Sequence, residues 1–137
     1  MQSIAILSAL LNAHAPLTAL VGSGAAARIY PLELPQGCLM PAIVIEAGVD
    51  APQTTDGMAS LGYVLRIAEL TLHVLAKTPT DLVAVQLAAE AACQFQRGTI
   101  AGYNVALVSA ATVGSPETDS GKMLWYLPLE FSVTYRR

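Results

Sequence analysis

The chain contains two histidines, His14 and His73, which are the side chains best suited to act as a general base or metal ligand near neutral pH. His14 follows an apolar segment, and His73 falls on the polar side of an expected strand. A zinc site needs three or four ligands, and neither histidine has a cysteine, aspartate or glutamate at ligand spacing. The chain also lacks the Gly-x-Ser-x-Gly motif of a serine nucleophile. The sequence therefore predicts no catalytic residues and no metal site.

Two glycine-containing segments partly match phosphate-binding motifs. Residues 22–27 fit the dinucleotide fingerprint G-x-G-x-x-A, which works between a strand and a helix, but here an expected helix precedes it and an extended piece follows. Residues 114–122 end in Gly-Lys like a phosphate loop, yet six residues separate the glycines where four are needed. Met123 stands where a serine or threonine should bind magnesium. We therefore expect no cofactor.

The composition is that of a chain with enough apolar residues for a sizeable core but few charges. Of 137 residues, 54% are hydrophobic and 12% are charged, and the net charge is −3. A soluble domain usually has about 25% charged residues. The acidic balance argues against a non-specific nucleic-acid binder, which needs a basic face. No stretch reaches the roughly 18 apolar residues of a membrane-spanning helix. A surface so poor in charge suggests that much of it contacts other protein.

The two cysteines, Cys38 and Cys93, lie 55 positions apart. They could pair, but buried free thiols in a reducing cytosol are the favoured interpretation. Residues 13–15, Ala-His-Ala, match the cleavage site of a signal peptide, yet no lysine or arginine precedes them. We therefore interpret the first segment as a helix of a cytoplasmic protein.

Apolar periodicity and turn residues divide the chain into helices and strands. Ser3 can cap a first helix, and Pro16 ends it or starts a second short helical piece. Thr80 can cap the clearest helix, an alanine-rich segment that closes near Arg97 and Gly98. The expected extended segments are residues 28–31, 42–45, 63–76, 105–108 and 125–135.

The longest two extended segments alternate polar and apolar side chains. Alternation runs without a break from Trp125 to Tyr135. In residues 63–76 its parity changes near Ala68, which predicts a β-bulge or a change of covered face. Pro128 cannot donate a ladder hydrogen bond, so it predicts that its strand lies at an edge or is locally interrupted.

The order helix, strand, strand, helix, strand, strand predicts one α+β domain over residues 1–137. We expect a mostly antiparallel four-stranded sheet with two main helices packed on one face. A polar segment at about 50–62 separates two strands and is expected to be a long loop, a feature that is usually functional or disordered.

Short motifs along nearly the whole chain form a pattern typical of one family. They are Leu10-Leu11, Leu20-Val21-Gly22, Arg28–Pro31, Pro41–Val44, Asp56-Gly57, Arg66–Val74, the Thr80-capped helix and Leu129–Tyr135. In these features the chain resembles the tail-completion or tail-terminator proteins of long-tailed phages and gene transfer particles. One departure is Leu72–Val74, where many relatives carry an aromatic residue.

The resemblance implies a virion protein of the tail neck without catalytic activity. Such proteins form a ring, typically a hexamer, on the last ring of the tail tube, where they stop tube growth and join the tail to the head. The implied partners are copies of the chain itself, the tail tube protein and the head-tail connector or head-closure protein. DNA would pass through the channel without tight binding, and no membrane is implied. The alternatives are another neck or head-closure connector protein and a small α+β ligand-binding or enzymatic domain.

The pattern also suggests contact surfaces for such a ring. The residues expected in an interface loop are Asp50, Thr54, Thr55, Asp56 and Gly57. The acids expected to face the lumen are Asp50, Asp56, Glu117 and Asp119. An edge strand marked by Pro128 and Glu130 is the third expected contact element.

Overall fold

The computed structural model describes residues 2–53, 65–119 and 124–136, in which two helices are followed by strands, a third α-helix and further strands. The α-helices are α1 (Gln2–Ala13), α2 (Ala15–Val21) and α3 (Pro79–Cys93), and a short 3-10 turn spans Gly24–Ala26. The strands are β1 (Ile29–Pro31), β2 (Ala42–Gln53), β3 (Leu65–Ala76), β4 (Gly98–Ile100), β5 (Tyr103–Val113), β6 (Glu117–Asp119) and β7 (Leu124–Arg136).

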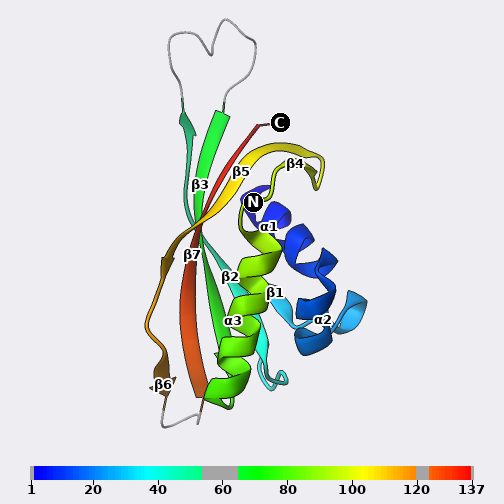
Figure 1. Ribbon diagram of the computed structural model, residues 1–137, viewed down its shortest axis with the longest axis vertical. Helices are drawn as coiled ribbons and strands as arrows, with labels where there is room; N and C mark the ends of the chain where they lie inside the picture. Colours follow the sequence, from blue (N-terminus) through cyan, green and yellow to red (C-terminus); the bar gives the residue numbers. More distant parts are fainter. Residues whose placement is uncertain (1, 54–64, 120–123, 137) are drawn as a thin grey trace, which may run out of the picture.

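The described strands form one seven-stranded sheet in the order β1-β2-β3-β7-β5-β4, with β6 paired to β7. β1 runs parallel to β2, and the other pairs are antiparallel. The helices lie together on one face of the curved sheet (Figure 1). The α+β class and the mostly antiparallel sheet are confirmed. The four-stranded count is wrong, because the three-residue strands β1, β4 and β6 extend the sheet formed by β2, β3, β5 and β7.

The first two helices place apolar side chains in the core. Leu7 and Leu11 of α1 and Leu17 of α2 are fully buried. Because α1 begins at Gln2, Ser3 is a buried residue of its first turn and not its cap. Pro16 is the second residue of α2, so it lies at the start of a second short helix, which is one of the two expectations. In the described part of the chain no single helix is long and apolar enough to cross a membrane, although α1 and α2 together, bent by 91°, would pass that test of length and composition.

The cap of helix α3 lies two residues earlier than expected. The side chain of Thr78 accepts a hydrogen bond from the backbone N–H of Asp81 at 3.2 Å, so Thr78 and not Thr80 is the cap. Pro79 suits the first helical position, where a missing N–H costs nothing. The helix ends at Cys93, short of Arg97, because Phe95 turns the chain with a φ of 60°.

The core depends on the pairing of β3 with β7, the two strands at the centre of the sheet. Their register runs without a break from Arg66–Tyr135 to Ala76–Trp125. Successive side chains point to opposite faces, so this register directs one parity of each strand toward the helices. The fully buried side chains that β3 and β7 place on that face are Ala68, Leu70, Leu72, Val74, Ala76, Leu127, Leu129, Phe131, Val133 and Tyr135. Trp125, which begins the alternation on the same parity, is only partly buried at the strand end.

A β-bulge lies near Ala68, but its extra residue is on the neighbouring strand. The β2–β3 register shifts between Ala47 and Asp50, so Gly48 and Val49 bulge out of β2. β3 keeps its alternation, and its parity change reflects partly buried Leu65 and Ile67 on the face away from the helices. Strand β2 also continues to Gln53, so the expected loop at 50–62 is wrong over its first four residues. The remainder of that segment lies outside the described residues.

Pro128 lies in a central strand, so the edge-strand prediction for Pro128 and Glu130 is wrong. β7 pairs with β3 on one side and with β5 and β6 on the other. The pairing of β5 with β7 ends at Val113–Leu129, and the pairing of β6 with β7 begins at Glu117–Tyr126. Pro128 lies in the gap between these two paired segments. The Pro128 carbonyl accepts a hydrogen bond from the N–H of Gly114 at 2.8 Å. The alternative expectation, a local interruption, describes this arrangement.

The buried position of Phe131 gives a test of the core. Replacing Phe131 by alanine removes a side chain with 1% exposure, and we expect it to lower the free energy of unfolding by about 3–5 kcal/mol. Ser132→Ala, one residue further on the opposite face, is the matched control and should change it by less than about 1 kcal/mol. Denaturant titration of both variants measures the difference. Equal stability of the two variants would contradict the register.

Candidate functional site: the acidic open face of the sheet

One face of the sheet is not covered by the helices, and we call it the open face. Four glutamates occupy it: Glu46 of β2, Glu69 of β3, Glu130 of β7 and Glu117 of β6, all exposed. The register explains their gathering, because Glu46 pairs with Thr71, Thr71 pairs with Glu130, and all three belong to the parity that points away from the core. Glutamates from four strands therefore share one surface.

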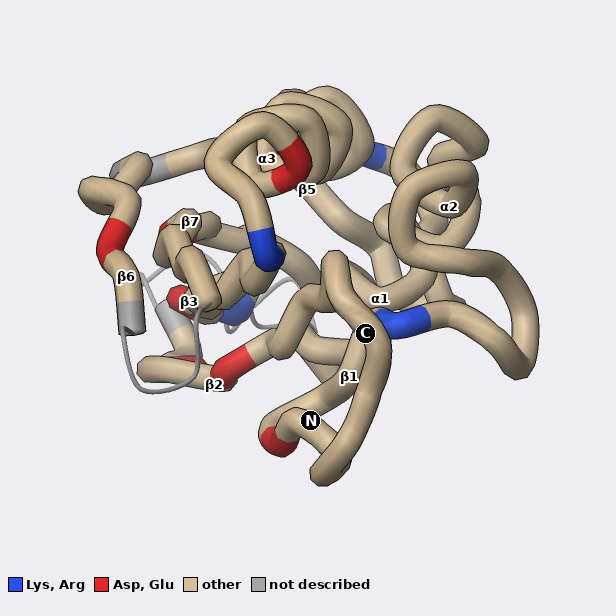
Figure 2. Tube along the Cα trace, turned by 90° about the horizontal axis from the view of Figure 1, so that it is seen from below, with Lys and Arg blue, Asp and Glu red and all other residues tan. Residues whose placement is uncertain are grey.

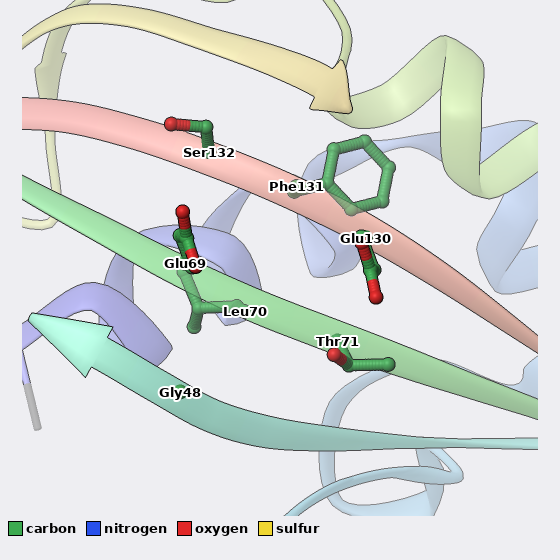
Figure 3. Close-up of a pocket in the computed structure, with 7 residues that line it drawn as sticks. All are labelled: Gly48, Glu69, Leu70, Thr71, Glu130, Phe131 and Ser132. Carbon is green, nitrogen blue, oxygen red and sulfur yellow. The ribbon is translucent and has the colours of Figure 1, made fainter. Parts of the chain in front are cut away.

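A hollow of about 180 Å³ lies in the middle of this face. It is lined by β3 and β7 around Glu69, Thr71, Glu130 and Ser132, with the bulge at Gly48 as one wall (Figure 3). Glu69 pairs with Ser132 and Thr71 with Glu130, so the two carboxylates stand diagonally on neighbouring strands. A Cβ on residue 48 would lie 2.8 Å from the carbonyl oxygen of Glu69, so the close approach of the bulge requires glycine.

Hydrogen bonds hold two of the glutamates in place. His73 Nε2 lies 2.5 Å from the Oε2 of Glu46. The Tyr126 hydroxyl donates to Glu117 from the neighbouring strand. Both contacts orient the carboxylates on the face.

The open face is acidic over most of its length. Within the described strands, the one lysine or arginine whose parity points to it is Arg136, at the far end of β7. No group of three or more metal-ligating side chains occurs among the described residues. The arrangement repels polyanions.

Asp50, expected both in the lumen and in the interface loop, lies on the other face. Its carboxylate receives hydrogen bonds from Arg66 Nε at 3.0 Å and from the Tyr135 hydroxyl at 2.6 Å. The Tyr135 hydroxyl also lies 3.3 Å from the side-chain oxygen of Gln2, and its ring packs edge-on against Tyr103. Asp50 therefore joins β2, β3, β7 and the start of α1 in a structural cluster. Burial first, and the Asp50 carboxylate second, raise the pKa of Tyr135 to about 12.

Of the other predicted site residues, some lie outside the described part of the chain and two lie in β6. Thr54, Thr55, Asp56 and Gly57 lie outside the described residues. Glu117 and Asp119 begin and end β6, and the hydrogen bond to Tyr126 places Glu117 on the open face.

Sequence reasoning missed Glu46 and Glu69 as acids of a common surface, and it assigned Glu130 to an edge strand. The signal that could have found Glu69 and Glu130 was the alternation itself, since both residues fall on the polar parity of their strands.

No protein-family model matches the chain, and no curated protein sequence matches it. Its structure is similar to a chain in a solved structure described as the virion of a native gene transfer agent (GTA) particle. The two chains share 15% sequence identity and align with a TM-score of 0.72, over 98% of this chain and 94% of the other. At this identity the similarity establishes a shared fold.

The Asp50 cluster gives a prediction about alkaline pH. The pKa of Tyr135 is about 12 in the folded chain and about 10 for an ordinary tyrosine, so the unfolded chain loses this proton first as the pH rises. The stabilisation is therefore fully present below pH 10 and is lost between pH 10 and 12. Urea titrations at several pH values across this range should show that the free energy of unfolding falls less in Tyr135→Phe than in the wild type. Tyr103→Phe, which leaves the hydroxyl on Asp50 intact, is the control and should follow the wild type.

Proposed function

We propose that this chain is a non-enzymatic virion structural protein that forms a ring at the head-proximal end of a phage-type tail tube. The ring ends tube growth and joins the tail to the head connector. The observation that carries the proposal is the shared fold over 98% of the chain with a component of a gene transfer agent virion. The low charge content supports it, because a ring subunit buries its lateral and axial surfaces against other protein. A sixfold ring is the proposed stoichiometry.

In the proposed ring the open face lines the channel through which DNA passes. Glu46, Glu69, Glu117 and Glu130 present negative charge to the phosphate backbone, which favours sliding over binding. Asp50 has no part in this lining, because its carboxylate is bonded to Arg66 and Tyr135 on the helix side. Residues 54–57 remain a proposed contact with the tube or with neighbouring subunits.

A second candidate function is that of another neck or head-closure connector protein. The virion description of the structural neighbour does not specify which component carries the shared fold. The two candidates differ in where the ring lies, at the end of the tube or against the head. Both predict a virion component and neither predicts catalysis.

Electron microscopy of particles tests the proposed position. Particles made without this chain should separate into filled heads and free tails, and the tails should be irregular in length because nothing ends tube growth. Complementation with the wild-type chain should restore joined particles of uniform tail length. Tails of uniform length without the chain, combined with a ring on the head side, would favour the connector alternative instead.

The charge of the open face gives a second prediction. The purified protein should bind duplex DNA weakly at low salt, because four glutamates face the phosphates. Glu69→Lys and Glu130→Lys should each raise the affinity and steepen its salt dependence, by about one unit of log–log slope per lysine that meets a phosphate. Asp81→Lys on α3 makes the same charge change on the helix side and should have a smaller effect. Fluorescence anisotropy over a salt series compares the variants, and tight salt-sensitive binding by the wild type would contradict the proposed lining.

A further inference from the structure

The outward side of α3 is apolar, although it faces solvent in the isolated chain. Val83, Leu87 and Ala91 follow one another at four-residue intervals, and Phe95, also exposed, lies in the turn that follows the helix end. The exposed fractions of Val83, Leu87 and Phe95 are 46%, 58% and 68%. The opposite side of α3 is buried in the core. A helix that is apolar on both sides is normally covered on both. We call these four residues the outer ridge.

A second apolar surface lies in the connection between β1 and β2. Residues 34–38 and Met40 line a hollow of about 540 Å³ together with Lys77 and Leu124. Leu39, between the lining residues Cys38 and Met40, is 71% exposed, and Leu32 just before the segment is 52% exposed. We call the hollow, together with the exposed side chain of Leu39, the 34–40 hollow. It is concave where the outer ridge is convex.

The two surfaces share no residue and belong to different sides of the molecule. In Figure 2, α3 lies at the top of the view beside β5 and β7, whereas β1 and β2, the strands that the 34–40 segment connects, lie lower down. One chain can therefore use both surfaces at the same time. Contacts between unlike surfaces of identical chains are heterologous, and they generate closed rings when the rotation closes.

Charges at the two surfaces are complementary. Helix α3 contains two acids, one of them Glu90 near the ridge, and no lysine or arginine. The lining of the hollow contains Lys77 and no acid. Neither Glu90 nor Lys77 forms an ion pair with another residue in the described part of the chain. Beyond these, Arg97 follows the ridge and Glu33 precedes the hollow, which offers a second pair of opposite sign.

We propose that the outer ridge of one subunit docks in the 34–40 hollow of the next, and that this is the lateral contact of the ring. The inference rests on the proposed function for the ring, and it adds the surfaces through which copies of the chain bind one another. The apolar ridge supplies the buried area, and the complementary charges fix the direction of assembly.

Sedimentation analysis of three variants tests the contact. The wild type should form one closed oligomer larger than a dimer, and both Leu87→Glu and Leu39→Glu should be monomeric with wild-type melting temperatures. A mixture of these two variants should form heterodimers and nothing larger, because the intact ridge of one fits the intact hollow of the other. Leu107→Glu adds the same charge at an exposed position outside both surfaces and should assemble like the wild type.

Three results would overturn the inference. They are a wild type that stays monomeric up to its solubility limit, a Leu87→Glu chain that still assembles, and a mixture that gives no heterodimer. If Leu87→Glu fails to assemble while Leu39→Glu still assembles, the ridges of two subunits pair with each other. That result would also refute the inference. Rings that form normally but are absent from the tail neck would refute the proposed function and leave the contact standing. Tail necks that incorporate Leu87→Glu as well as the wild type would refute the contact alone.

Discussion

The pairing of β3 with β7 is the constraint on which the rest of the structure depends. Its register is continuous from Arg66–Tyr135 to Ala76–Trp125, and every other long strand joins one of these two. Because side chains alternate across a strand, a slip of one residue would move Phe131 from the core to the open face and Glu130 into the core. The hydrophobic core and the acidic surface are thus two results of one register.

Two local features allow other strands to follow this central pair. Gly48 lets β2 bulge against the backbone of Glu69, after which Asp50 turns toward Arg66 and Tyr135. At the other end, β5 leaves and β6 joins on either side of Pro128, the one position of β7 where an N–H could not have been used. A side chain on Gly114 would collide with the Pro128 ring, so the change of partner also requires glycine there.

Much of this arrangement could be predicted from the sequence, and the failures have physical reasons. The alternation from Trp125 to Tyr135 and the alanine-rich segment were sufficient to locate β7 and α3. A residue without an N–H fits either an edge strand or a gap between two partners of a central strand. Pro128 alone therefore could not show whether its strand is at the edge or the centre of the sheet. Residues 50–53 have the composition of a loop and become strand only because β3 offers partners, such as Ala68 for Asp50. The open-face acids come from distant strands, and only the register brings them together.

The central pairing has a further consequence for how the chain reaches this structure. The paired residues of β3 and β7 are far apart in the sequence, from Ala76–Trp125 at one end to Arg66–Tyr135 at the other. They can pair only after the segment between them, which includes α3 and β5, has been synthesised and folded back. Sheets built on such distant contacts have high contact order and fold on the order of milliseconds to seconds, because the loop must close before its contacts form. Until then β3 presents an alternately apolar edge to other chains. Rapid synthesis at high temperature is therefore expected to favour aggregation, and slower synthesis should favour the folded subunit.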